Sequence, residues 1–467
     1  MALILAALAG FIASAAFHPL DFWPALFVGV GLLFHLNTSR GFSAWQRVGL
    51  NLVFGICFQV ITLYWIGTYV GTIAWVALVL MQATFFIVLS FASSPLTFAL
   101  GWVAFEFVLR RFPFGGFGWS RIGYALTESP LNYLYPRISI VGVAFLVVLI
   151  TTSLVKNYKN QGKLIKSAAS ALSLLALLAL IPVNIKETGI IKVALVQGGQ
   201  TEKLDNTFEN ANSALAKHFR ATKLISPDSV DLVIWPENVI MHDPTVRKST
   251  KEFLNQEVSR INAPILVNAN LVDGTNGTLL IGGPTAEGKI QSYSKRYLTP
   301  FGEFMPLRGL VERISDKAKL VSGYTPGAEP VLFKTQQGNF RTLICYELLS
   351  DKQARNEMSD SDFIVTQTNN ATYFKTWQLE QELAIAQARS AETSRHSAYV
   401  STTGVTSIID EQGRITNSIP KYTNQVLIDK VETRSGITPA TRFGSALEVL
   451  LLILWLPLTF LSRRKGY

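Results

Sequence analysis

Two kinds of hydrophobic pattern divide the chain. Long uncharged apolar runs fill residues 1–184 and return near the C-terminus, whereas residues 186–444 mix polar and apolar positions as a soluble domain does. A helix needs about 20 apolar residues to cross the hydrocarbon core of a bilayer, and fewer where neighbouring helices shield its ends. The apolar runs therefore predict membrane spans at residues 2–17, 22–37, 48–67, 70–92, 95–110, 138–155, 166–184 and 445–462.

The polar segment predicts an alternation of helices and strands. Apolar residues recur with helical spacing over 206–225, 248–261 and 375–394. Short apolar runs predict strands at residues 191–196, 230–235, 263–271, 277–282, 289–295, 340–345, 363–368, 398–402 and 405–410. This alternation is typical of a layered α/β domain, in which reactive side chains collect beyond the carboxyl ends of strands.

Composition supports a division of the chain into a part surrounded by lipid and a part surrounded by water. The 467 residues are 49% hydrophobic and 16% charged, whereas about 25% of the residues in an ordinary soluble protein are charged. We expect a transmembrane domain of about seven helices at residues 1–185 and a polar extracytoplasmic domain at 186–444. A C-terminal transmembrane helix with a basic cytoplasmic tail is expected at 445–467.

Basic residues gather beside the predicted spans, so the net charge of +10 does not call for a nucleic-acid partner. Because lysine and arginine are enriched on the cytoplasmic side of membrane proteins, they predict that the polar domain faces away from the cytoplasm. The residues used for this orientation are Arg40, Arg47, Lys156, Lys159, Lys163, Lys166, Arg463, Arg464 and Lys465. A second basic group flanks an outer loop, where it either departs from the rule or holds lipid phosphate. Its members are Arg110, Arg111, Arg121 and Arg137.

That outer loop, residues 112–124, is rich in aromatic residues and glycine and contains Trp119 and Arg121. One interpretation is an aromatic belt at the membrane interface. The other is a loop that dips into the bilayer and shapes a lipid entry path. Glu106 lies one helical turn before Arg110, which predicts an ion pair between these two side chains.

Three segments each place one reactive side chain where a predicted strand ends. They are Trp235-Pro236-Glu237, Tyr293-Ser294-Lys295 and Ile344-Cys345-Tyr346-Glu347. A free thiol has a pKa of about 8.5, so a cysteine nucleophile needs a group that takes its proton. A carboxylate supplies that base, and an ammonium stabilises the thiolate and a later oxyanion. The set therefore predicts a cysteine nucleophile with its own base and oxyanion partner.

Neighbouring groups complete this prediction. Glu303 and Glu347 lie close in sequence to the lysine and the cysteine, and we expect them to orient the lysine or to shuttle protons. The backbone N–H of Tyr346, which follows the nucleophile, can act as a second oxyanion donor.

Cysteine and histidine usage narrows the chemistry further. The chain has two cysteines, Cys57 and Cys345, so a disulfide framework is excluded. Cys57 lies in an apolar span and is interpreted as a packed small hydrophobe. The five histidines lack metal-ligand spacing such as HxxxH, and we expect no metal site and no cofactor.

These motifs together resemble those of the nitrilase, or carbon–nitrogen hydrolase, superfamily, whose Glu-Lys-Cys triad sits in an α-β-β-α sandwich. With spans before and after that domain, nearly the whole chain is similar to the apolipoprotein N-acyltransferases, the membrane-bound branch of this superfamily. The resemblance implies a multi-span α-helical membrane domain joined to a nitrilase-like α/β sandwich. Further matching pieces are residues 193–198, 299–303 and 401–404 and the Gly-Phe-Gly-Trp run that ends at Trp119.

The resemblance implies a role for each matching residue. Glu237 would be the general base, Lys295 the oxyanion-stabilising cation and Cys345 the nucleophile. The motif positions thought to support the triad or the acyl group are Glu303, Tyr346 and Glu347.

Two segments depart from the family pattern, and both are expected to line the substrate entrance. Many members carry a tryptophan near residues 199–205, where this chain has none. At residues 369–374 the usual Asn-Asp-x-Trp-Phe is replaced by a run that ends in Tyr373 and Phe374.

The reaction implied by the resemblance is a ping-pong acyl transfer at a bacterial inner membrane. The thiol would take an acyl chain from a membrane phospholipid and pass it to the N-terminal amine of a diacylglyceryl apolipoprotein. A membrane-anchored amidase that hydrolyses a small amide needs the same triad and remains an alternative. A transporter or sensor predicts polar groups buried within the spans, and of these we note Glu106 alone.

Overall fold

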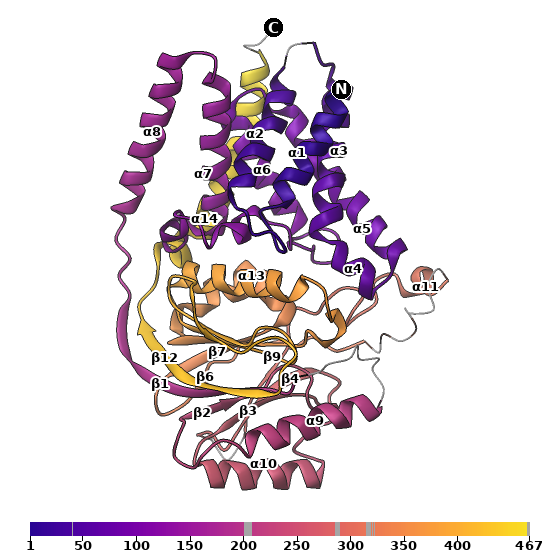
Figure 1. The fold of residues 1–467 in the computed structure, drawn as a ribbon, viewed down its shortest axis with the longest axis vertical. Helices are drawn as coiled ribbons and strands as arrows, with labels where there is room; N and C mark the ends of the chain where they lie inside the picture. Colours follow the sequence, from indigo (N-terminus) through magenta and orange to yellow (C-terminus); the bar gives the residue numbers. More distant parts are fainter. Residues whose placement is uncertain are drawn as a thin grey trace. The chain divides into compact units, whose positions relative to one another are not determined.

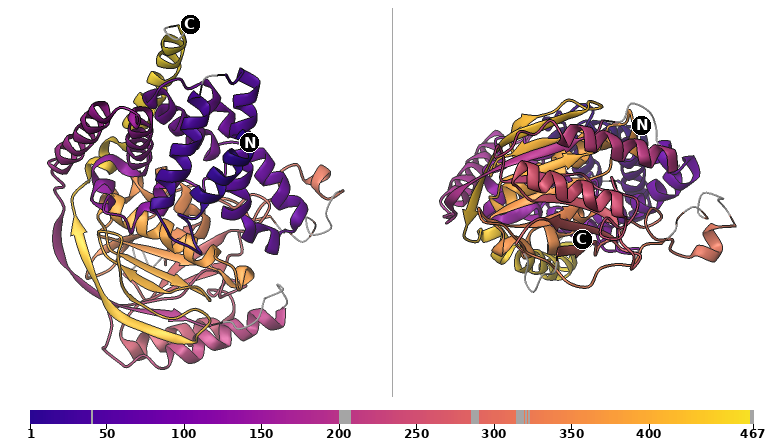
Figure 2. Two further views of the ribbon diagram at one scale, coloured as in Figure 1. Left: turned by 45° about the horizontal axis from the view of Figure 1, so that its top comes forward. Right: turned by 90° about the horizontal axis from the view of Figure 1, so that it is seen from below.

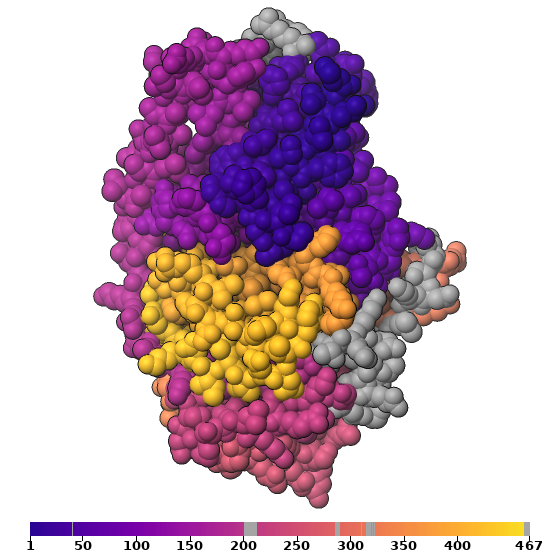
Figure 3. All heavy atoms as spheres, in the orientation of Figure 1, coloured from indigo at the N-terminus to yellow at the C-terminus, as the bar shows by residue number. Residues whose placement is uncertain are grey.

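The computed structural model describes residues 1–39, 41–199, 208–284, 290–313, 319, 321 and 323–464. The chain divides into two compact units (Figures 1 and 3). Residues Met1–Val183 and Thr438–Tyr467 form the helical unit, and Asn184–Ile437 form the sheet unit. The described strands all belong to the sheet unit.

In the helical unit, each predicted span contains a helix. Five described helical segments are long and apolar enough to cross a membrane, at Ala44–Thr62, Thr72–Phe91, Asn132–Asn157, Gln161–Ala179 and Pro439–Leu461. The helices are α1 (Ala2–Ser14), α2 (Pro24–Thr38), α3 (Ala44–Thr62), α4 (Tyr64–Tyr69), α5 (Thr72–Phe85), α6 (Pro95–Leu109), α7 (Tyr135–Asn157), α8 (Gln161–Ala179) and α14 (Pro439–Arg464). Short 3₁₀ turns, Phe86–Phe91, Ile122–Leu126 and Asn132–Leu134, extend or connect them.

The buried carboxylates of Glu106 and Glu448 in the helical unit are both paired with arginines, and the polar residues buried there correct two expectations. Glu106 does not form the predicted ion pair with Arg110. Its carboxylate lies 3.5 Å from Arg121 Nε and accepts the backbone N–H of Ile122 at 3.1 Å. Arg110 instead pairs with Glu448, which α14 brings from the far end of the sequence. The expectation that Glu106 stands alone among buried polar groups of the spans is wrong. Asn37, Asn51, Gln59, Gln82 and Glu448 are buried as well.

The sheet unit contains two six-stranded sheets. The first has the order β12-β1-β2-β3-β4-β5, and the second has the order β11-β10-β9-β8-β7-β6. The strands of the first sheet are β1 (Lys186–Gln197), β2 (Leu232–Ile234), β3 (Ile265–Asn270), β4 (Asn276–Ile281), β5 (Gln291–Ser294) and β12 (Gln425–Ser435). Those of the second are β6 (Phe333–Lys334), β7 (Asn339–Ile344), β8 (Phe363–Thr368), β9 (Ser397–Ser401), β10 (Ser407–Ile409) and β11 (Ile415–Ser418).

Alternation along β1 shows how the layers are built. Ile191, Val193 and Leu195 enter a core shared with Phe340 and Val365 of the second sheet. Ala194 and Val196 of β1 face a second core, which α9 (Phe208–Thr222) and α10 (Lys248–Ile261) close from outside. Because strand side chains alternate between faces, a strand buried on both sides is apolar throughout.

Helices complete the outer layers. α9 and α10 lie side by side on the first sheet (Figure 2), where Phe219 stacks on Phe253 with ring centroids 3.7 Å apart. The buried helix α13 (Gln378–Thr393) packs against β9 of the second sheet. Short helices α11 (Arg308–Val311) and α12 (Asp351–Ala354) lie in connections. The sheet unit is therefore an α-β-β-α sandwich, as the resemblance implies.

The topology brings several strand ends to a common edge. In the first sheet, β2 and β3 are parallel, and two antiparallel steps through β4 give β5 the same direction. In the second sheet, β7, β8 and β9 are parallel. Gln367 joins the two sheets near these ends, because its Nε2 donates to the Trp235 carbonyl at 2.7 Å.

Candidate functional site

A buried lysine is shared by two carboxylates at this edge. Lys295, directly after β5, places its Nζ 2.9 Å from Glu237 Oε1 and 2.8 Å from Glu303 Oε1. The Lys295 side chain is 1% exposed and that of Glu237 is 4% exposed. The structure thus brings together three of the residues predicted from sequence.

Amide groups hold both carboxylates in place. Asn276 Nδ2 donates to Glu237 Oε1 at 3.1 Å and to Glu303 Oε1 at 3.4 Å. The second oxygen of Glu237 accepts the backbone N–H of Asn369 at 3.1 Å, and the second oxygen of Glu303 accepts that of Thr299 at 2.8 Å. Each carboxylate is therefore oriented through both oxygens.

Cys345 occupies a sharp turn directly after β7. Its φ of 49° lies in the left-handed region, which is uncommon for a residue with a side chain and is sustained only by its surroundings. Glu347 supplies that support. Its Oε2 accepts the Ile344 N–H at 2.9 Å, and its Oε1 accepts the hydroxyl of Tyr293 at 2.6 Å.

The charges of these same groups shift the pKa of the Cys345 thiol. Burial and the charges of Glu382 and Glu237 raise the pKa of the Cys345 thiol well above its usual value, although Lys295 opposes them. Burial raises the pKa of Glu237, against the pull of Lys295. The two carboxylates outweigh burial at Lys295 and raise its pKa well above the usual value. The resting site therefore holds a thiol beside an ammonium, and the thiol needs a base before it can attack.

Supporting residues are also buried here. Burial raises the pKa of Glu347 in spite of its hydrogen bonds from Tyr293 and the backbone. Burial and the charge of Glu303 likewise raise the pKa of the Tyr346 hydroxyl. Both residues follow Cys345 in the 3₁₀ turn Cys345–Leu349, so they share the environment of the thiol.

A further carboxylate at the site was missed by the sequence reasoning. Glu382 lies on α13 and is 1% exposed, and its charge, like that of Glu237, raises the pKa of the Cys345 thiol. Its helix is buried over nearly all its length, so the apolar pattern does not set Glu382 apart. No motif in the sequence indicates a role for Glu382.

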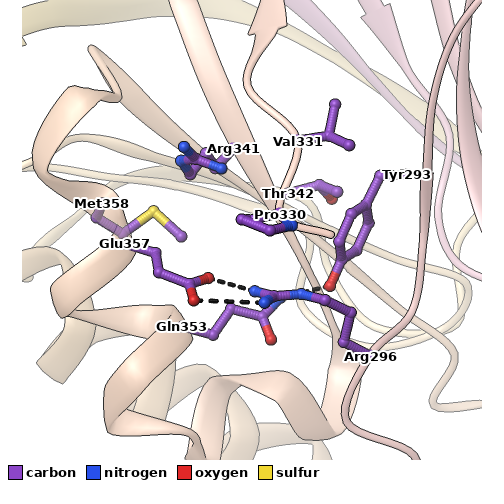
Figure 4. A pocket seen from close by; sticks show the side chains of 9 residues that line it. All are labelled: Tyr293, Arg296, Pro330, Val331, Arg341, Thr342, Gln353, Glu357 and Met358. Carbon is purple, nitrogen blue, oxygen red and sulfur yellow. Dashed lines mark hydrogen bonds and ion pairs between the residues drawn. The ribbon is translucent and has the colours of Figure 1, made fainter. Parts of the chain in front are cut away.

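A small cavity lies beside Tyr293 and Arg296 (Figure 4). Arg296 pairs there with Glu357, and Gln353 Nε2 donates to the hydroxyl of Tyr293 at 2.6 Å. Tyr293 also donates to Glu347, so the cavity borders the support of the turn. Its lining is Tyr293, Arg296, Pro330, Val331, Arg341, Thr342, Gln353, Glu357 and Met358, none of which is a candidate nucleophile or base.

One cluster of side chains has the composition of a metal site. The ligand atoms of His396, Glu411 and Glu432 lie within 4.8 Å of one another. Arg434 Nη2 lies 2.9 Å from Glu432 and 3.5 Å from Glu411, so a cation already balances these carboxylates. The hydrogen bond from His396 lowers the pKa of Glu411 to about 2. We interpret the cluster as an ion-pair network rather than a metal centre.

The predicted substrate-entry residues fall in different places. Phe374 packs against Tyr422 with ring centroids 4.7 Å apart, and Tyr373 ends the 3₁₀ turn Ala371–Tyr373. Trp119 and Arg121 are 4% and 0% exposed within the helical unit, and Arg121 is paired with Glu106. Their assignment to a lipid path stays a prediction. The departure at residues 200–205 lies outside the described residues.

Comparisons with known proteins match both units. The model of the apolipoprotein N-acyltransferase N-terminal domain matches residues 9–153. The carbon-nitrogen hydrolase model matches residues 192–436, which is more than half of the chain.

Curated relatives match the chain over nearly its full length. The apolipoprotein N-acyltransferase of Coxiella burnetii is 26% identical over 98% of this chain and 99% of its own. That of Haemophilus influenzae is 27% identical over 99% and 96%. A solved CN-hydrolase superfamily protein from Xanthomonas campestris has 18% identity and a TM-score of 0.40, and covers 58% of this chain and 97% of its own. The chain belongs to the carbon-nitrogen hydrolase family, in the membrane-bound branch that carries an apolipoprotein N-acyltransferase N-terminal domain.

Proposed function

We propose that Glu237, Lys295 and Cys345 form the catalytic triad of an apolipoprotein N-acyltransferase. The observation that carries the proposal is the ammonium of Lys295, which two buried carboxylates hold at 2.9 and 2.8 Å beside a cysteine in a strained turn. Such a constellation supplies a nucleophile, a base and a fixed positive charge in a water-poor site. Full-length relatives with this named activity support the same assignment.

In the first step, Cys345 Sγ attacks the ester carbonyl of a membrane phospholipid. Glu237 takes the thiol proton and returns it to the departing alkoxide, which leaves as lysophospholipid. Lys295 stabilises the oxyanion of the tetrahedral intermediate, together with the backbone N–H of Tyr346. The product is a thioester on Cys345.

In the second step, the free α-amine of a diacylglyceryl-cysteine attacks the thioester. The C–N bond forms, the C–S bond breaks, and the thiol is restored. Glu303 keeps the Lys295 ammonium in position through both steps, because it forms an ion pair with that ammonium in addition to the one from Glu237.

We further propose that the sheet unit faces away from the cytoplasm at a bacterial inner membrane. Its two ends continue into α8 and α14, both apolar enough to span. The lysines between α7 and α8 mark the cytoplasmic side of α8 by the positive-inside rule. Reporter fusions at residue 230 and at residue 159 test this orientation, because the two positions must report opposite sides.

Labelling the nucleophile tests the assignment, and the second cysteine provides a matched control. The full-length protein is incubated with phospholipid carrying a labelled acyl chain, and the protein is analysed by mass spectrometry. Cys345→Ser is expected to abolish thioester-linked label, whereas Cys57→Ser is expected to retain it. Persistent thioester label in Cys345→Ser would exclude Cys345 as the acylated residue.

The amidase alternative is separated from acyl transfer by substrate choice. A lipid ester plus a diacylglyceryl-cysteine peptide should give an N-acylated peptide. Hydrolysis of a soluble small amide, with no acylated peptide, would favour the alternative.

A further inference from the structure

Four carboxylates, three buried and one partly buried, belong to the candidate site, and one differs from the rest. Both oxygens of each of the other three, Glu237, Glu303 and Glu347, accept hydrogen bonds. Glu382 is bonded through one oxygen alone. Its Oε2 receives Thr368 Oγ1 at 2.8 Å, Asn370 Nδ2 at 2.5 Å, Gln378 Nε2 at 3.2 Å and Tyr399 OH at 3.4 Å. Its Oε1 is buried and has no hydrogen-bond partner among the described residues.

The unpartnered Oε1 of Glu382 destabilises the site when no substrate is bound. A buried acceptor without a donor destabilises the folded protein, and more so when the group is charged. The four donors on Oε2 fix the carboxylate, so Oε1 cannot turn to another protein donor without breaking them. An oxygen held in this way is suited to receive an N–H or O–H group from a bound molecule.

Glu382 also lies where such a molecule would react. Asn370, which donates to Glu382, directly follows Asn369, whose backbone N–H donates to Glu237 at 3.1 Å. The charge of Glu382 also raises the pKa of the Cys345 thiol, in the turn after β7. Glu237 and Glu303 share one ammonium, that of Lys295, at 2.9 and 2.8 Å. These three groups and Glu382 therefore hold more carboxylates than cations, which favours a cationic group as the second substrate.

The proposed acyl transfer needs a base that the triad does not supply. An α-amino group has a pKa of about 7.7–8.0, so the acceptor arrives mostly as an ammonium at neutral pH. Its nitrogen must lose one proton before it can attack and a second as the amide forms. Glu237 can carry the second proton back to the sulfur, but the first proton needs a different acceptor.

We propose that Glu382 Oε1 binds the ammonium of the acceptor and takes its first proton, which gives the second half-reaction its own base. This inference rests on the proposed function. The ammonium gives one proton to Glu382, and the free amine attacks the thioester carbonyl. As the C–N bond forms and the C–S bond breaks, the second proton passes through Glu237 to Cys345 Sγ. Glu382 then loses its proton to water, and the site returns to its initial state.

Separate measurement of the two half-reactions tests this role. The full-length protein is first acylated with labelled phospholipid, and a diacylglyceryl-cysteine peptide is then added at a series of pH values from about 6 to 9, which bracket the amine pKa. At pH 6.5, Glu382→Gln is expected to slow acyl transfer relative to acyl-enzyme formation by roughly 15–30-fold, which is the excess of ammonium over free amine at that pH. The deficit should shrink as pH rises through the amine pKa, because free amine then needs no base.

A same-helix variant provides the matched control. Glu380→Gln removes the same charge from the first turn of α13, where Glu380 pairs with Lys421. It is expected to keep the wild-type ratio of the two half-reactions at every pH. A deficit in Glu382→Gln that is the same at every pH would indicate a structural role and overturn the proposal, as would an unchanged ratio.

The wild-type protein gives a second test that does not depend on how the variant folds. With Glu382 as base, the transfer rate should rise by clearly less than tenfold per pH unit below the amine pKa. A full tenfold rise per unit would mean that the enzyme uses only pre-formed free amine, and would overturn the proposal. Failure of the wild-type protein to form an acyl-enzyme would instead overturn the proposed function itself.

Discussion

Replacing Lys295 with methionine tests the central geometry of the site. The change removes the ammonium from between Glu237 and Glu303 and leaves an unbranched apolar side chain of similar length. Removing one partner of a buried ion pair costs about 3–5 kcal/mol, because the other charge stays buried without compensation. Two carboxylates lose their cation here, at 2.9 and 2.8 Å. We therefore expect a loss near the upper end, about 5 kcal/mol.

The expected loss is large enough to measure in the full-length protein. For a folding unit of this size, each kcal/mol shifts the unfolding midpoint by about 2–4 °C. Lys295→Met should therefore lower the midpoint by roughly 10–20 °C in fluorescence-monitored thermal unfolding in detergent. Lys352→Met, at an exposed lysine of the sheet unit, is the control and should remain close to wild type.

A double-mutant cycle identifies the cause of the loss. Glu303→Gln alone should cost less, about 1.5–3 kcal/mol, because Lys295 keeps Glu237 as its partner. In the Lys295→Met background the same change removes an uncompensated charge, so the double variant should be more stable than the two single effects predict. Additive effects, or a Lys295→Met midpoint close to wild type, would refute the shared ion pair.

Two further predictions follow from charge and from close packing. Burial and the charge of Glu303 raise the pKa of Glu237, so Glu303→Gln should move the acid limb of acyl-enzyme formation to lower pH. A pH profile of labelling measures this shift, and a limb that stays in place would contradict it. Gly198→Ala should strongly lower the unfolding midpoint, because a Cβ there would lie 2.2 Å from the His218 ring. Gly189→Ala is the control, since the nearest contact to its Cβ is 3.4 Å, and similar midpoints for the two variants would count against the packing argument.

Burial on both faces explains why many elements could be located from sequence. The helix α10 at Lys248–Ile261 and the strand β8 at Phe363–Thr368 coincide with their predicted ranges. β8 is buried at every position, so it appears in the sequence as a short continuous apolar run. The α-β-β-α arrangement could be expected from the resemblance, and Lys295, Glu237 and Glu303 were expected near one another for the same reason.

Other features depend on partners that are remote in the sequence. β12 mixes exposed and buried residues and pairs with β1, more than two hundred residues earlier, so no local apolar run predicts it. The pairing of Arg110 with Glu448 likewise joins α6 and α14 across most of the chain. Glu382 is hidden for a different reason: a buried helix places polar residues wherever the neighbouring elements offer hydrogen bonds.

The pairing of β1 with β12 has a consequence for how the protein is made. The ladder runs from Lys186 opposite Ser435 to Gln197 opposite Gln425, so the first and last strands of the sheet unit are neighbours. During synthesis the edge of β1 that pairs with β12 stays uncovered until almost the entire sheet unit has been synthesised. Unpaired edges of this kind recruit foreign strands. The nascent sheet unit is thus prone to aggregation until β12 has been synthesised, shortly before α14. A chaperone that shields the edge of β1 would have its greatest effect in that interval.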